Sequence, residues 1–437
     1  MKAARRRHDR RIVALGLPAL GALAADPLVS LVDTAFVGRL GTTSLAALGI
    51  DAALFGLAFF AFNFLAYGVT PLVAKALGEG DRERAASLIS NALVAAIGLG
   101  VAVTILVQIV AVPALELMGA TGDVLAEATG YLRIRVLAAP AVLIITLGHG
   151  AFRGHQDTRT PLYVTLALNA VNLVLDPVLI FGLDWGLNGA AVATLVAQWF
   201  GAAWFLALIG RRLGFSLSGV ALTELFGLAR IGRDVVIRTA ALLVTFTVAT
   251  RVAATIGDVE VAAHQIVAQI LFFLALAIDA LAVAAQSLIP RYLGEKRDTD
   301  AWDVSIRVLQ LGLGVGIVLA GLLIATRSFV PGWFTSEVAV QDAVDDVWPI
   351  LAAIQPLAAL VYVWDGIVMG AADFSFVAWA MVVSMIAAVA TLLLVVPLGW
   401  GLPGVWWSIG VLTVVRAVTL GWWHFRPAGK LRPARSV

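Results

Sequence analysis

The sequence predicts an all-helical integral membrane protein with twelve transmembrane helices, arranged as two six-helix bundles. Of its 437 residues, 61 % are hydrophobic and 13 % are charged, which is about half the charged share of an ordinary soluble domain. The mean hydropathy is +0.96, and a soluble fold of this size could not keep that much apolar surface away from water. The composition therefore excludes a soluble enzyme, a nucleic-acid-binding protein and a disordered protein.

Twelve apolar stretches are long enough to cross the hydrocarbon core, for which a helix needs about 20 residues. In lipid only helices and closed barrels satisfy their backbone groups, and these stretches are too long and too uniformly apolar for barrel strands. The predicted spans are 12–38, 44–74, 86–114, 125–149, 160–183, 187–210, 225–256, 260–290, 303–326, 342–370, 375–398 and 402–425.

The basic residues predict the orientation. With the N-terminus in the cytoplasm, 23 of the 30 Lys and Arg residues lie at the cytoplasmic ends of the spans or in cytoplasmic loops, as the positive-inside rule requires. Both termini are then cytoplasmic. The basic start and the Ala22-Leu23-Ala24 stretch resemble a secretory signal peptide. The apolar run continues to Gly38, however, so we expect it to remain as the first span.

An internal repeat divides the chain into two halves. Short motifs recur in order at an offset of 215 or 216 residues, each at a predicted helix end. The pairs are Leu77-Gly78-Glu79 with Leu293-Gly294-Glu295, Gly150, Gly154 and Asp157 with Gly366, Gly370 and Asp373, and Trp185-Gly186-Leu187 with Trp400-Gly401-Leu402. The offset covers six helices, so the halves share one orientation, which defines a parallel repeat. We predict an N-terminal bundle at 1–212, a cytoplasmic linker at 213–224 and a C-terminal bundle at 225–437.

Two six-helix halves of this kind are typical of secondary transporters. No phosphate-binding loop of the form G-x-x-x-x-G-K-[ST] is present, which leaves an ion gradient as the expected energy source. The absence of cysteine and the five scattered histidines argue against a metal site. We expect no bound cofactor and no enzymatic activity.

Carboxyl groups within the spans are the most informative residues, because a charge at the centre of a membrane costs about 2.5–3.5 kcal/mol on insertion scales. Asp26 and Asp33 are seven residues apart and share a face of the first span. Asn172 and Asp176 share a face of the fifth span, and Asn169 extends that stripe. A buried carboxyl group that binds and releases a proton would couple transport to H⁺.

The repeat places this polar site in the first half. The positions that correspond to Asp33, Asn172 and Asp176 in the second half are Ala249, Ala388 and Leu392. A purely structural group should appear in both halves, whereas an ion site need not.

The polar residues of the spans also allow a structural interpretation. The aspartates could hold helices together, bonded to backbone or to Arg133 and Arg135, instead of binding an ion. Arg238 and Asp279 are interpreted as a structural ion pair, with gating as the alternative. The roles of Asp51 and Asp365 are left open, and His149 and His264 are expected to be hydrogen-bonded packing residues.

Pro18 and Pro27 predict a bend in the first span, because proline removes a helical hydrogen bond.

The chain resembles the multidrug and toxic compound extrusion (MATE) family, in its DinF-like branch, over nearly its full length. The matching stretches are 26–38, 152–161, 172–177 and 262–265. The resemblance implies a V-shaped pair of six-helix bundles that alternates between outward-open and inward-open states. It also implies export of amphipathic, often cationic, compounds in exchange for H⁺ or Na⁺.

The resemblance also assigns residues to the cavity of the first half. Asp33 matches the family's aspartate in the first helix and Pro18 its bending proline, whereas Asp26 stands where some relatives have an amide. Asn172 and Asp176 match the polar pair of the fifth helix, and Thr194 matches a threonine of the sixth. No matching carboxylate was identified in the second half, which favours H⁺ over Na⁺.

The sequence thus predicts a monomeric, proton-coupled antiporter in a bacterial cytoplasmic membrane, with small organic substrates and membrane lipids as its partners and no nucleic acid. Two alternatives within the superfamily are Na⁺-coupled antiport of the same cargo and flipping of a lipid-linked precursor. The mostly acidic membrane charges argue against an anionic pyrophosphate cargo. A channel or receptor is the alternative from another class, and it would show no saturable exchange.

Overall fold

The computed structural model describes residues 2–60, 64–214, 221–426 and 429–431. Within these ranges the chain is helical and contains no strand, which confirms the predicted fold class. The helices of the first half are α1 (Lys2–Gly38), α2 (Thr42–Phe60), α3 (Phe64–Gly78), α4 (Arg82–Leu117), α5 (Gly122–Arg135), α6 (Ala139–Gly154), α7 (Arg159–Pro177) and α8 (Gly186–Leu208). Those of the second half are α9 (Leu222–Ile256), α10 (Asp258–Gly294), α11 (Asp298–Thr326), α12 (Pro331–Phe334), α13 (Val338–Gly370), α14 (Phe374–Val395) and α15 (Gly401–Phe425).

Eleven helical segments in the described ranges are long and apolar enough to cross a membrane. The remaining predicted span, 44–74, coincides with the shorter helices α2 and α3 on either side of residues 61–63, which are not described. Residues 215–220 of the predicted linker also lie outside the described residues.

The helix ends confirm the internal repeat. α2 begins and α3 ends at positions that lie 216 residues before the two ends of α10. The turns repeat as well: Gln156 and Ala372, 216 residues apart, have φ angles of 60° and 55°. A non-glycine residue rarely adopts this left-handed conformation, so its recurrence at one offset indicates the same tight turn in both halves.

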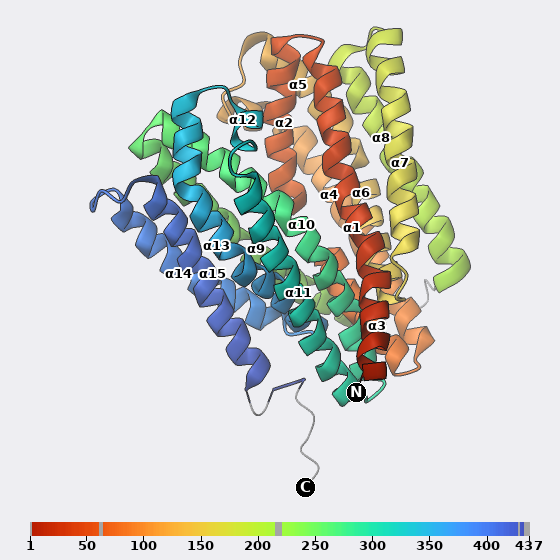
Figure 1. Ribbon diagram of the computed structural model, residues 1–437. Coiled ribbons are helices and arrows are strands. Elements are labelled where there is room, and N and C mark those ends of the chain that lie inside the picture. The colour runs from red at the N-terminus through yellow and green to blue at the C-terminus, as the bar shows by residue number, and fades with distance from the viewer. Residues whose placement is uncertain (1, 61–63, 215–220, 427–428, 432–437) are drawn as a thin grey trace. The chain divides into compact units, whose positions relative to one another are not determined.

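Close helix packing repeats at the same offset. A Cβ atom on Gly100 of α4 would lie 2.4 Å from the Cα of Pro140, and a Cβ on Gly316 of α11 would lie 2.8 Å from the Cα of Pro356. Small residues let membrane helices approach closely, which maximises van der Waals contact where lipid provides no hydrophobic driving force. Within the two halves, α7 lies beside α8, and α14 lies beside α15 (Figure 1).

The described chain forms two compact units. The N-terminal unit comprises the described residues of Leu17–Gly232, and the C-terminal unit comprises those of Met1–Gly16 together with those of Arg233–Val437. The first helix of each half, α1 or α9, therefore begins in one unit and continues into the other. Within the C-terminal unit, both oxygens of Asp9 accept hydrogen bonds from Arg307, and Arg11 donates to the Tyr292 hydroxyl over 2.6 Å.

We expect Gly100→Ala and Gly316→Ala each to lower the free energy of unfolding by about 1–3 kcal/mol, because an added methyl group overpacks a backbone contact. Gly98 and Gly314 are the matched controls, since they lie on the same two helices and an added Cβ there would meet no described atom within 4 Å beyond the surrounding helical turn. Alanine should leave the stability there unchanged or slightly higher, because it favours helix more than glycine. Thermal unfolding of the detergent-solubilised variants measures the difference, and equal shifts at all four positions would contradict this packing.

Candidate functional site

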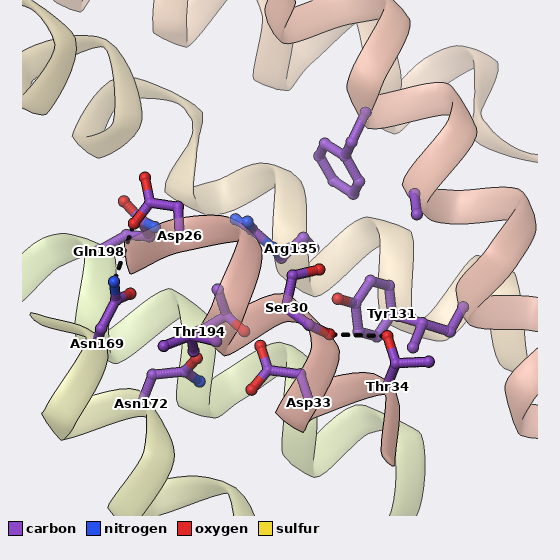
Figure 2. A pocket seen from close by; sticks show the side chains of 14 residues that line it. Asp26, Ser30, Asp33, Thr34, Tyr131, Arg135, Asn169, Asn172, Thr194 and Gln198 are labelled. Atoms are coloured by element: carbon purple, nitrogen blue, oxygen red, sulfur yellow. Dashed lines mark hydrogen bonds between the residues drawn. The ribbon is translucent and has the colours of Figure 1, made fainter. Parts of the chain in front are cut away.

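A polar stripe on α1 faces a pocket within the N-terminal unit. Asp26, Ser30, Asp33 and Thr34 all line this pocket, since residues three, four and seven positions apart share one face of a helix. The Thr34 hydroxyl donates to the carbonyl oxygen of Ser30 over 2.8 Å (Figure 2). The structure thus places the two aspartates that the sequence singled out on one wall.

The opposite wall comes from α7. Asn169 and Asn172 line the pocket, and Asp176 lies one turn further along, buried behind it. The Asn169 side-chain amide donates to Asp26 over 2.9 Å (Figure 2), and the Asn172 amide donates to Asp176 over 3.3 Å. Each predicted amide therefore contacts a predicted carboxyl group.

The carboxyl groups of Asp33 and Asp176 lie within hydrogen-bonding contact of each other, on α1 and α7. One oxygen of each is buried and has no further hydrogen-bond partner among the described residues. Two carboxylates in contact repel each other strongly when both are ionised away from water, so this arrangement suits a site that a proton or a cation can occupy. The pair can bind a proton or a small cation, and it links two helices.

Three further helices complete the pocket, which has a volume of about 310 Å³. Thr194 and Gln198 come from α8, Tyr131 and Arg135 from α5, and Phe55 from α2. The Thr194 hydroxyl donates to the carbonyl oxygen of Ala190 in its own helix. Sequence reasoning found Thr194 but missed Gln198 and did not assign Tyr131 or Arg135 to the pocket. A four-residue spacing was the available signal, because Gln198 follows Thr194 and Arg135 follows Tyr131 by one turn.

Irregular backbone adjoins the site. Asp176 and Pro177 end α7, and a π-helical turn follows at Val178–Gly182; such turns frequently occur at functional sites. Pro18 and Pro27 both lie inside the continuous helix α1, where each removes one backbone hydrogen bond and leaves a carbonyl oxygen free. These positions give α1 and α7 local points at which the backbone can adjust.

The C-terminal unit has apolar residues at the positions equivalent to the carboxyl and amide groups of the pocket. Ala249, Ala388 and Leu392, which correspond to Asp33, Asn172 and Asp176, are fully buried. The cavity there has a volume of only about 20 Å³. Leu242 and Ile409 line it on one side, and Tyr362 and Arg416 also contribute to its lining. The polar pocket is therefore a feature of one half of the repeat.

The C-terminal unit instead holds a buried ionic cluster. Asp365 accepts hydrogen bonds from Arg238, over 2.6 Å, and from Arg416. The Arg416 guanidinium also lies 5.9 Å from the centre of the Tyr362 ring. The sequence did not predict Asp365 as the partner of Arg238, because the two residues are 127 positions apart and only the fold brings them together.

The remaining polar residues differ in their surroundings. Asp51 on α2 is fully buried, and neither of its carboxyl oxygens has a hydrogen-bond partner within the described ranges. His149 lies 3.2 Å from the Thr165 hydroxyl and 3.4 Å from Arg153, as expected for a packing residue. His264 packs against Trp406, but its Nδ1 has no hydrogen-bond partner in the part of the chain that the structure describes. Among the described residues, no group of three or more His, Asp or Glu side chains is arranged to hold a metal ion.

A multi-span protein with two repeated helical halves and a carboxyl-lined pocket in one of them has the architecture of a secondary transporter. The sequence profile of the MatE family matches residues 18–178 and 235–394. The chain belongs to this family of multidrug and toxin efflux transporters, whose members are not enzymes, and the resemblance predicted from the sequence motifs is confirmed.

Known proteins agree with this assignment. The chain is 35 % identical to DETOXIFICATION 44, a chloroplastic protein of Arabidopsis thaliana, over 94 % of this chain and 81 % of the relative. It is 27 % identical to the DNA damage-inducible protein F of Escherichia coli, over 94 % of this chain and 91 % of the relative. A Vibrio cholerae MATE transporter structure shares the fold with a TM-score of 0.88 at 21 % identity, covering 96 % of both chains.

We expect Asp365→Asn to destabilise the protein by about 3–5 kcal/mol, because it leaves two buried arginines without their carboxylate. The matched control is Asp345→Asn, which removes an ion pair with Arg327 between exposed side chains; such pairs contribute little. Thermal unfolding of both purified variants provides the comparison. A variant at Asp365 as stable as the control would show that the cluster does not support the fold.

Proposed function

We propose that this protein exports amphipathic organic compounds, cationic ones included, by proton-coupled antiport and alternating access. The observation that carries the proposal is the contact between the half-buried Asp33 and the buried Asp176 at a pocket of about 310 Å³. A membrane protein rarely keeps such carboxyl groups without a functional reason. That the equivalent residues of the other half are apolar and buried supports a transport role over a scaffolding role.

The proposed cycle uses the charge of the pocket. When Asp26 and Asp33 are ionised, they attract a positively charged group on a substrate that enters from the cytoplasm. Protonation of the Asp33–Asp176 pair from the outside removes that attraction and alters the contact between α1 and α7, and the substrate leaves. Release of the proton to the cytoplasm restores the binding state, so one gradient drives the other flux.

The same carboxyl and amide oxygens of Asp33, Asn172 and Asp176 are also suitable ligands for Na⁺. The proposal favours H⁺ because the two carboxyl groups contact each other directly, an arrangement in which a shared proton is the simplest bridge. We further propose that the protein acts as a monomer in a bacterial cytoplasmic membrane, surrounded by lipid, with both termini in the cytoplasm.

The first test is ethidium uptake into inverted membrane vesicles that contain the protein. A vesicle interior more acidic than the medium mimics the outward-facing proton gradient. We expect uptake that disappears when the pH gradient is collapsed and that does not depend on Na⁺. Uptake that requires Na⁺ and ignores the pH gradient would overturn the proposed coupling ion, and no uptake under either gradient would contradict export of this cargo class.

We expect Asp33→Asn to reduce pH-driven ethidium uptake to the level of vesicles without the protein, because an amide cannot carry the proton. The protein should remain folded, since asparagine has nearly the same volume. The matched control, Asp123→Asn, changes an exposed carboxylate at the start of α5 and should transport normally. Size-exclusion chromatography checks that both variants are monodisperse, and full uptake by the variant at Asp33 would refute its coupling role.

A further inference from the structure

Arg135 lines the pocket from the end of α5 and forms no ion pair within the part of the chain that the structure describes. Its guanidinium lies 5.2 Å from the centre of the Phe55 ring and interacts with the Tyr131 phenol one turn earlier on the same helix. Both neighbours are uncharged aromatic groups. A permanent cation in a membrane-spanning segment without a carboxylate partner requires a functional explanation.

Two other intramembrane arginines show what a structural role looks like in this chain. Arg238 and Arg416 are both paired with the buried carboxylate of Asp365. Arg133, two residues before Arg135, has an exposed side chain. Arg135 differs from all three, because it is half-buried and its guanidinium reaches into a cavity (Figure 2).

The pocket therefore has walls of opposite charge. Asp26 and Asp33 lie on α1, whereas the positive charge of Arg135 comes from α5. Asp33 is close enough to Arg135 for their charges to interact, but the two side chains form no salt bridge. A simple monocation can satisfy the carboxylates only at the expense of repulsion from the guanidinium, whereas a molecule that carries both charges complements both walls.

We propose that Arg135 binds the acidic group of the cargo, so that the preferred substrates are amphipathic zwitterions with a basic amine and a carboxylate. The guanidinium donates two parallel hydrogen bonds to a carboxylate, a geometry that lysine cannot reproduce. Phe55 and Tyr131 provide the apolar surface against which the body of such a molecule packs. This inference rests on the proposed export function, because it assigns a substrate class to the same pocket.

The test compares two probes that differ only in the carboxylate, norfloxacin and its methyl ester, with the full-length purified protein. Binding is measured by isothermal titration calorimetry in detergent, and pH-driven transport is measured in proteoliposomes. We expect the wild-type protein to bind norfloxacin about tenfold more tightly than the ester, because the ester cannot form the charge-assisted hydrogen bonds between the carboxylate and Arg135. Norfloxacin binding that is no tighter than binding of the ester would overturn the proposal.

Variants then assign the preference to Arg135. We expect Arg135→Gln to weaken norfloxacin binding to the level of the ester while ester binding stays unchanged or improves. Arg135→Lys should fall between the two, because it keeps the charge and loses the bidentate geometry. Arg133→Gln is the matched control and should behave as wild type. Equal loss for both probes at Arg135 would indicate a structural role and overturn the proposal.

The transport measurement keeps this inference separate from the proposed function. Tight norfloxacin binding that depends on Arg135, combined with an absence of pH-driven transport of every probe, would support the binding role and refute proton-coupled export. Ethidium transport together with equal binding of norfloxacin and its ester would support export and refute the role of Arg135.

Discussion

The absence of water from the bilayer core is the constraint on which the rest of this structure depends. It requires every spanning segment to satisfy its backbone internally, which produces long helices such as α4 and α10. It also removes the hydrophobic force between helices, so that contact must come from close packing at small residues such as Gly100 and Gly316. Finally, it raises the free energy of each buried charge. A charged side chain in a span is therefore paired with an opposite charge, neutralised by a proton, or retained for a function.

The two halves of the repeat respond to that constraint in different ways. The C-terminal unit pairs its charges, with Asp365 between two arginines. In the N-terminal unit, Asp33 and Asp176 contact each other, and no described Lys or Arg side chain forms a salt bridge to either of them. A carboxylate between two guanidinium groups has its charge balanced, whereas two carboxyl groups in contact disfavour each other's charged form. The two halves of one repeated architecture therefore differ in how their intramembrane carboxyl groups are compensated.

The sequence was sufficient to predict the fold class, because hydropathy and the 216-residue repeat reflect local chain properties. It also identified the carboxyl and amide residues of α1 and α7, since their spacing places them on one helix face. It could not reveal the contact between Asp26 and Asn169, which are 143 residues apart, or the pairing of Arg238 with Asp365. Such contacts depend on how helices are packed, and periodicity within one helix carries no information about its neighbours.

Arg135 illustrates the same limit most clearly. In the sequence it is one of two arginines near a helix end, and a role in bonding the aspartates was a reasonable interpretation. The fold separates the two arginines, since it exposes Arg133 and directs Arg135 into the pocket. Because its nearest partners are aromatic rings, the charge of Arg135 remains available in every protonation state of the aspartates. The pocket thus combines a fixed positive charge with negative charges that can be removed, and a cargo that matches both would be held or released by protonation alone.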